Sequence, residues 1–197
     1  MTKQRAIEIL EQNMKSSNLR NHCKAVGFMM GGVYDFLSSN VKLEESDPSK
    51  EVWETVGILH DSDYELTKDD HEKHTLVALE WLNKEGLSKD DPIYLAIMSH
   101  NNGITGLRSP QTQVEWALEC GDDLTGFIIA VALVHPDKKL ANVTMESVMK
   151  KWSQKAFAPG VHRERVEMCE EKIGIPLKDF VEITLKAMQE HAKELGL

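Results

Sequence analysis

The chain has 197 residues, 41% hydrophobic and 28% charged, which is the composition of one globular domain with a substantial core. Its formal net charge of −9, from 32 acidic and 23 basic residues, argues against a broad basic surface that binds a nucleic-acid polymer. Three cysteines without a CxxC pair indicate a reducing compartment. No apolar run reaches the roughly 20 residues that cross a bilayer. We therefore expect a cytoplasmic protein without membrane contact.

Helical patterns follow one another along the chain, and no segment alternates with the period of a strand. Ser16 can cap the second helix, and Asp47 can cap the third, with Pro48 at its first position. Polar loops are expected at 62–69 and 101–110. The expected helices cover about 7–14, 19–37, 48–60, 76–86, 92–100, 111–134, 144–152 and two segments that flank Gly174 and Pro176. The sequence therefore predicts a single all-α domain.

Two histidines and two aspartates lie on faces that otherwise read as buried. His22 and His60 each continue an apolar helix stripe, where a lone histidine is more often a core residue than a ligand. Asp61 adjoins His60 at a helix end, and Asp122 shares its helix face with Leu118. A carboxylate in a core must be paired or must bind a metal, because an isolated buried charge costs too much. The four residues together predict a metal centre, which favours a hydrolase.

Other residues near these positions remain alternatives. Asp123, next to the last of these aspartates, is a poorer candidate for the same role. Cys23 and Cys120 also adjoin proposed ligands, and each is either a thiolate ligand or a small buried side chain. His71 could pair with His74, although its polar surroundings favour a surface position.

The order of a lone histidine, a His-Asp pair and a distant aspartate resembles the HD superfamily of metal-dependent phosphohydrolases. Several longer stretches are similar to small HD-domain hydrolases: Leu59–Glu65, Glu72–His74, Ser99–Asn101, Asp122–Gly126, Val134–Leu140 and Phe157–Val161. The resemblance implies a compact helical HD-domain bundle over residues 1–197. Its metal-ligand core would cover about 19–135, with C-terminal helices at 144–196 packed on it. By position, the ligands of one divalent ion would be His22, His60, Asp61 and Asp122.

A second metal is an open alternative. Some HD enzymes hold two ions and use two further histidines between the His-Asp pair and the last aspartate. His74 and His100 occupy that interval on inward faces, and Asp61 would then be the bridging carboxylate. The alternative is that the two histidines hydrogen-bond to the other ligands or contact phosphate. The ion could be Mn, Fe, Ni, Co, Zn or Mg.

Hydrolysis at such a centre needs no protein nucleophile, because a bound divalent ion lowers the pKa of its water to near neutrality. Asp61 is then the catalytic ligand. Asp63 and Glu65 follow it on a loop and could orient water or take its proton, with solvated loop carboxylates as the alternative. Some HD nucleotidases carry a glutamate three residues after the motif's aspartate. Tyr64 stands there in this chain, and this departure puts the transfer of that family's general base in doubt.

Substrate contacts are predicted from charge and position. Lys138 and Arg163 are candidates to bind phosphate, although such residues usually solvate a helix face. Asn101, directly after His100, is a candidate wall of the pocket. A Gly-Tyr-Pro element after His100 is missing, which argues against the cyclic dinucleotide phosphodiesterase branch.

The expected function is therefore hydrolysis of a phosphate ester in a nucleotide or another small phosphorylated metabolite. The first alternative is a catalytically silent HD domain that binds a metal or a ligand. The second is a helical interaction module in which the histidines and aspartates satisfy one another. Phe28, Met29 and Met30 could serve a homodimer, with core packing as the alternative.

Overall fold

A computed structural model describes residues 1–40, 43–44 and 47–197, and these residues form an all-α fold without strands. The α-helices are α1 (Lys3–Asn13), α2 (Ser17–Ser39), α3 (Lys50–Leu59), α4 (Tyr64–Thr67), α5 (Leu76–Lys84), α6 (Pro92–His100), α7 (Asn102–Thr105), α8 (Gln113–Val134), α9 (Met145–Trp152), α10 (Arg163–Val166), α11 (Cys169–Ile173), α12 (Leu177–Glu190) and α13 (Ala192–Leu195). In the described part of the chain, no helix combines the length and the apolar character that crossing a membrane requires.

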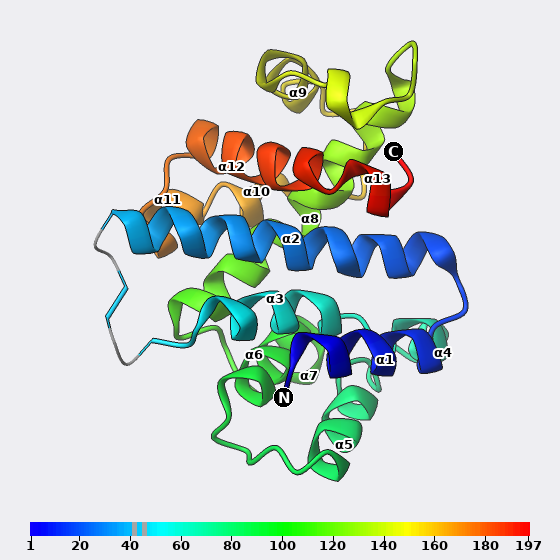
Figure 1. Cartoon of the computed structure of the whole chain (residues 1–197), viewed down its shortest axis with the longest axis vertical. Helices are drawn as coiled ribbons and strands as arrows, with labels where there is room; N and C mark the ends of the chain where they lie inside the picture. The colour runs from blue at the N-terminus through cyan, green and yellow to red at the C-terminus, as the bar shows by residue number, and fades with distance from the viewer. Residues whose placement is uncertain (41–42, 45–46) are drawn as a thin grey trace.

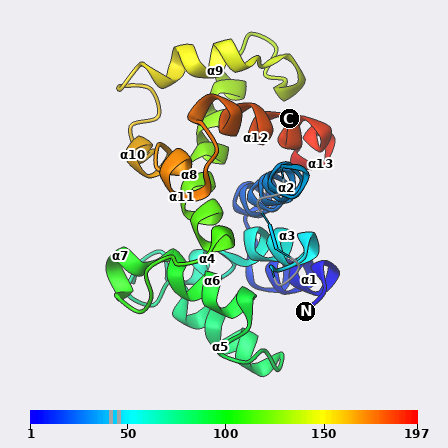
Figure 2. The same ribbon diagram turned by 90° about the vertical axis from the view of Figure 1, so that its left-hand side faces the viewer.

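Helix α2 lies at the centre of the molecule, between two sets of helices. Helices α1 and α3 lie on one side of it, and α12 and α13 lie on the other (Figures 1 and 2). Helix α8 crosses behind α2 and contacts α2, α6, α10, α11 and α12. One cluster of buried apolar side chains connects these helices, from Leu10 in α1 through Val26 and Phe127 to Phe180 in α12.

Two glycines set the distance between α2 and α3. A Cβ added to Gly57 would lie 2.6 Å from the backbone nitrogen of Gly27 and 2.7 Å from its Cα. Only hydrogen atoms fit between the two backbones at this crossing. The short distance brings His22 of α2 near the end of α3, where His60 and Asp61 follow.

Side chains cap two of the helices, and the cap of α2 is the expected one. The residues that accept a hydrogen bond from a first-turn N–H are Ser16 before α2 and Asp91 before α6. The predicted start of α3 is wrong, because this helix begins at Lys50 with Ser49 as its N-cap. The Asp47 carboxylate accepts a hydrogen bond from the Glu44 backbone N–H at 2.7 Å. Its side chain is therefore engaged in the preceding turn.

Short helices occupy segments that the sequence predicts as loops. Helix α4 lies within 62–69 and α7 lies within 101–110, while α10 and α13 have no predicted counterpart. The segment 62–69 is also less solvated than its polar sequence indicates, since Ser62, Asp63 and Thr67 are buried. A four-residue helix has too few positions to reveal a period, which explains why the sequence does not predict it.

The cluster Phe28, Met29 and Met30 packs in the core and is not available for a homodimer. Met29 and Met30 are fully buried, and Phe28 is buried apart from a small edge. The Phe28 ring stacks on His191 with 3.8 Å between the ring centroids. Core packing, the alternative for these three residues, is therefore confirmed.

Candidate metal centre

Four histidines and two aspartates from separate segments meet at one point, which we call the candidate metal centre. The six residues are His22 of α2, His60 and Asp61 after α3, His74 before α5, His100 at the end of α6 and Asp122 in the middle of α8. Their nitrogen and oxygen atoms form three overlapping groups, and within each group the atoms lie within 4.8 Å of one another. These six residues could hold a metal ion, and they are the six that the sequence indicates.

The Asp61 carboxylate lies between two pairs of histidines. Its Oδ2 atom lies 3.6 Å from Nε2 of His60 and 4.0 Å from Nε2 of His22. Its Oδ1 atom lies 3.1 Å from Nε2 of His74 and 3.2 Å from Nε2 of His100. One carboxylate therefore presents each of its oxygens to a different histidine pair, as a bridging ligand would.

Asp122 completes the group around His22 and His60. Its Oδ1 atom lies 2.9 Å from Nε2 of His22 and 3.4 Å from Nε2 of His60. The opposite nitrogen of His22, Nδ1, lies 3.5 Å from the Thr125 hydroxyl, which donates its own hydrogen to the Asp122 carbonyl. The hydroxyl can therefore accept the Nδ1 hydrogen, which leaves the Nε2 lone pair of His22 toward the centre.

The orientation of His60 is a second indication of a cation site. Its Nδ1–H donates to the Gly57 carbonyl at 2.7 Å, so the lone pair of the neutral ring is on Nε2. The side chain is fully buried, and none of the described residues forms a hydrogen bond with Nε2. A buried lone pair that faces two carboxylates requires a proton or a cation between them. This is the tautomer in which metal-binding histidines are normally held.

Asp63 holds His74 in the same tautomer. Its Oδ1 accepts the Nδ1 hydrogen of His74 at 2.8 Å, and its Oδ2 accepts the backbone N–H of Ala78, in the first turn of α5, at 2.9 Å. Asp63 is fully buried, so the alternative of a solvated loop carboxylate is wrong for this residue. Thr75, between these partners, has a φ of 72°, which is strained for a β-branched residue. The geometry gives Asp63 a positioning role.

We expect Asp63→Asn to lower metal affinity by about 10- to 100-fold, the usual effect of losing the partner of a ligating histidine. Both groups that contact Asp63 are hydrogen donors, so the amide NH₂ of an asparagine would face one of them. Equilibrium dialysis with Mn²⁺ measures the change. Asp69→Asn, which removes an exposed charge from the same loop, is the matched control. Equal affinities in the two variants would contradict the positioning role.

The charges of the centre stabilise one another when no cation is present. Burial disfavours a charged His60 ring, but the Asp61 and Asp122 carboxylates outweigh burial and raise its pKa to about 9. Burial acts the same way on His74, where hydrogen bonds with Asp61 and Asp63 raise the pKa to about 9. Burial acts to raise the pKa of Asp61. The charge of His60 and the hydrogen bonds with His100 and His74 outweigh burial and hold this pKa well below its usual range.

These raised pKa values make metal binding dependent on pH. Below about pH 9, His60 and His74 carry protons that a cation must displace. We expect the apparent affinity for Mn²⁺, on the side of His60 and on the side of His74, to rise between pH 7 and 9 by up to about 10-fold per pH unit, because one proton competes with each ion. It should level off above pH 9. Calorimetry in two buffers of different ionisation enthalpy counts the released protons, and binding without proton release would contradict the proposed ligands.

Glu65, a candidate base, has other partners. Its Oε2 accepts hydrogen bonds from the backbone N–H groups of Lys15 at 2.6 Å and Ser16 at 3.0 Å. These hydrogen bonds lower the pKa of Glu65 and make it a weaker proton acceptor. The contacts of Glu65 therefore fix the turn between α1 and α2.

The candidate substrate residues differ in position. Asn101 follows the candidate ligand His100, and its amide donates to the carbonyls of His71 and His74 at 2.9 and 3.2 Å. Lys138 is exposed beyond the end of α8, which lies about 18 Å along the helix axis from Asp122. Of these candidates, Asn101 borders the centre and Lys138 does not.

Arg163 is also directed away from the centre, because its guanidinium holds a neighbouring turn. It donates to the carbonyls of Trp152 and Phe157 at 3.1 and 2.7 Å, and it lies over the Phe127 ring at 5.0 Å from the centroid. These contacts therefore do not support phosphate binding by Arg163, and they indicate a structural role instead.

The alternative ligands do not join the centre either. Asp123 contacts His162, whose backbone N–H and Nδ1 both lie 3.2 Å from its Oδ2. Burial raises the pKa of the Cys23 thiol well above its usual range and that of Cys120 to about 12, so both remain neutral thiols. His71 is exposed, as its polar surroundings indicate.

A cavity of about 590 Å³ opens beside His100. Its lining comes from the 101–110 segment, from α8, from α10 and from Met168, which precedes α11. Helices α7 and α10 lie on the same side of α8 in Figure 2. Glu119 of α8 and Arg165 of α10 lie in this lining and were not predicted as site residues. Glu119 is one helical turn before Asp122, a spacing that could have indicated it.

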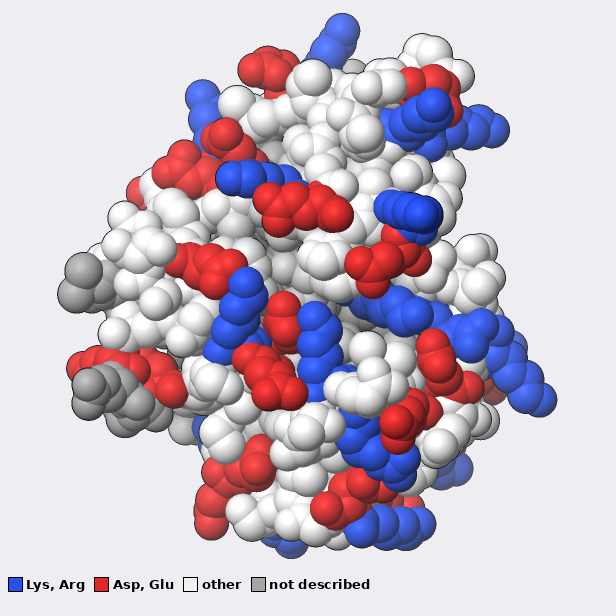
Figure 3. All heavy atoms as spheres, in the orientation of Figure 1, with Lys and Arg blue, Asp and Glu red and all other residues white. Residues whose placement is uncertain are grey.

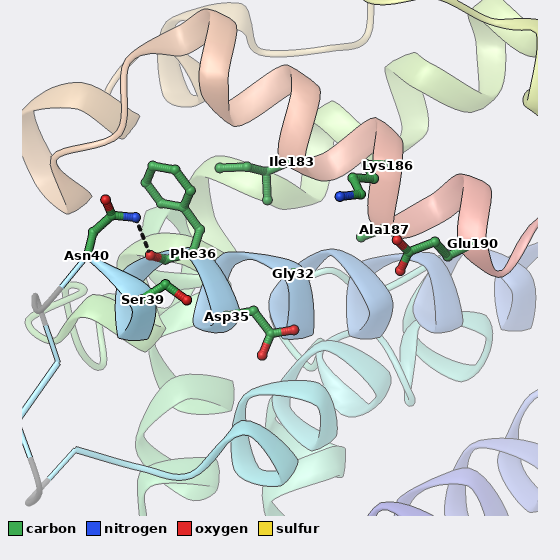
Figure 4. Close-up of a pocket in the computed structure, with 9 residues that line it drawn as sticks. All are labelled: Gly32, Asp35, Phe36, Ser39, Asn40, Ile183, Lys186, Ala187 and Glu190. Atoms are coloured by element: carbon green, nitrogen blue, oxygen red, sulfur yellow. Dashed lines mark hydrogen bonds between the residues drawn. The ribbon is translucent and has the colours of Figure 1, made fainter.

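A second groove of about 330 Å³ lies between α2 and α12 and has no residue of the candidate centre in its lining (Figure 4). Gly32, at its base, lies ten positions after His22, or about 15 Å along α2. Basic and acidic side chains are interspersed on the face shown in Figure 3. Unlike this groove, the cavity beside His100 adjoins the candidate metal centre.

Searches of protein-family models, curated proteins and solved structures find no match. The case for a function therefore depends on the geometry of the candidate metal centre and on the cavity that adjoins it.

Proposed function

We propose that this protein is a metal-dependent phosphohydrolase of the HD type, which cleaves a phosphate ester of a nucleotide or another small phosphorylated metabolite. The observation that carries the proposal is the Asp61 carboxylate, whose two oxygens face two histidine pairs. His22, His60 and Asp122 would hold one divalent ion with Asp61 Oδ2. A second ion would be held by Asp61 Oδ1 and two histidines, His74 and His100.

The donor set fits a divalent transition metal. Imidazole nitrogens and carboxylate oxygens suit Mn, Fe, Co, Ni or Zn, whereas an all-oxygen set would favour Mg or Ca. The buried Nε2 atom of His60, which lacks a hydrogen bond among the described residues, supports a cation at this point. When bound, such an ion lowers the pKa of a coordinated water and polarises a phosphoryl oxygen.

The residues of the chain would prepare the centre for this chemistry. Asp63 and the Gly57 carbonyl keep His74 and His60 in the tautomer that binds a cation. The cavity beside His100 offers space for a substrate next to the centre, and a volume of about 590 Å³ is within the range for small-molecule sites. The base that takes the proton from water is not assigned to a residue, since Asp63 and Glu65 both have other partners.

A phosphatase screen tests the proposal. Metal-free protein is reconstituted with Mn²⁺, Fe²⁺, Co²⁺, Ni²⁺, Zn²⁺ or Mg²⁺ and incubated with nucleotides and other phosphomonoesters, and inorganic phosphate is measured. We expect release with at least one ion and none after chelation. Stoichiometric metal without phosphate release would favour the silent metal-binding domain. Failure to bind any of these ions would contradict a metal centre altogether.

A further inference from the structure

The cavity beside His100 has both apolar and polar residues in its lining. Its lining includes apolar groups from Ile104, Pro110, Trp116 and Met168. The remaining lining is polar, with amide groups from Asn101 and Asn102 and a charged pair, Glu119 and Arg165. A cavity of about 590 Å³ is much larger than a phosphate ion needs. It could hold an organic group together with an anion.

The Arg165 side chain extends from α10 across this cavity. Its Nε lies 3.6 Å from Glu119 Oε1 on α8, and its Nη2 lies 4.0 Å from the position that a Cβ on Gly103 would occupy. The guanidinium thus approaches both α8 and α7. Of the candidate metal centre, His100 lines this cavity, so the guanidinium lies in a cavity that borders the centre at His100.

The hydrogen-bond donors of Arg165 are free, in contrast to those of Arg163 in the same short helix. The Arg163 guanidinium donates to four backbone carbonyls. No described residue accepts a hydrogen bond from the Arg165 guanidinium, and its side chain is 46% exposed. A guanidinium with free donors can bind two oxygens of one phosphate in parallel.

Glu119 does not satisfy Arg165. The 3.6 Å separation is longer than a charge-assisted hydrogen bond, and an ion pair with one exposed partner is weak. Burial also raises the pKa of Glu119, although Arg165 acts to lower it. The carboxylate therefore keeps Arg165 in the cavity without occupying its donors.

We propose that Arg165 binds the phosphate group of the substrate in the cavity beside His100, while the apolar lining there contacts the organic group. This inference rests on the proposed function and narrows its substrates to phosphate esters with an organic group large enough to reach Trp116 and Met168. It assigns substrate binding to Arg165 in place of Arg163.

Calorimetric titration of Mn²⁺-loaded protein with inorganic phosphate tests the anion contact without turnover. We expect Arg165→Ala to weaken binding by at least about 10-fold and Arg165→Lys to restore part of the loss. Metal content should remain that of the wild type. The control is Lys155→Ala, which removes one positive charge from an exposed residue that has no hydrogen bond or ion pair with the described residues. Equal phosphate affinities for wild type and Arg165→Ala would overturn the assignment.

A second variant tests the organic group. Gly103 is exposed, and a Cβ at this position would meet only Arg165, at 4.0 Å. Gly103→Leu should therefore fold, and its side chain should fill part of the cavity. We expect it to weaken phenyl phosphate binding by more than about 5-fold relative to inorganic phosphate. Equal losses for the two ligands would overturn the placement of the organic group. Phosphate binding that depends on Arg165 in a protein without turnover would contradict the proposed function but not the anion site.

Discussion

Asp61→Ala should abolish metal binding at both positions of the candidate centre and lower phosphatase activity by at least about 1,000-fold, an effect typical of removing a group that acts at the reacting centre. The magnitude follows from the position of the carboxylate, since each of its oxygens faces a different histidine pair. Removing it also deprives His60 and His74 of one of the two carboxylates that stabilise each protonated ring. Elemental analysis of the purified variant measures the first effect.

Asp123→Ala is the matched control for this substitution. Asp123 is also acidic and lies next to the ligand candidate Asp122, but its carboxylate contacts His162 outside the centre. We expect this variant to keep its metal and its activity. Circular dichroism of both variants separates loss of the site from loss of the fold. Wild-type metal content in Asp61→Ala would contradict the ligand assignment.

Gly57→Ala should destabilise the protein by about 3 kcal/mol, the upper part of the range for overpacking in a core. The added Cβ would lie 2.6–2.7 Å from backbone atoms of Gly27 and Val26, which cannot rotate away as a side chain could. Helices α2 and α3 would have to separate. Because α2 carries His22 and the end of α3 carries His60, metal affinity should fall together with stability.

Gly126→Ala is the control for the glycine substitution. A Cβ at this helical position of α8 would have no atom within 4 Å, so the change should stabilise the protein by about 0.5–1 kcal/mol through helix propensity. Urea denaturation of the two variants gives both values. A Gly57→Ala variant as stable as the wild type would show that the helix crossing can relax.

The positions of the six candidate ligands could be predicted because each lies in or beside a helix whose apolar positions are clear in the sequence. The pattern around Asp122 even distinguished it from Asp123, which lies about 100° further around the helix and contacts His162. The role of Asp63 could not be predicted in this way. Its partner His74 is 11 positions away, across a turn that depends on an unusual backbone conformation at Thr75.

Arg165 shows a different limit of sequence-based prediction. It lies on a helix of four residues, which is too short to display a hydrophobic period. Its significance comes from a cavity whose lining is formed by segments more than 50 positions apart in the chain. Arg163, two residues earlier, was the predicted phosphate contact, because a positive charge alone does not reveal which arginine already has acceptors.

The net charge of the candidate metal centre depends on how many of its ligands are charged. Four of the six groups are histidines, which are neutral as ligands, and only Asp61 and Asp122 bring a negative charge. Two divalent ions bring four positive charges, and two carboxylates leave a net charge of +2. A fully loaded centre would therefore attract anions even though the whole chain carries a net charge of −9. Phosphate and the second ion should then each strengthen the binding of the other.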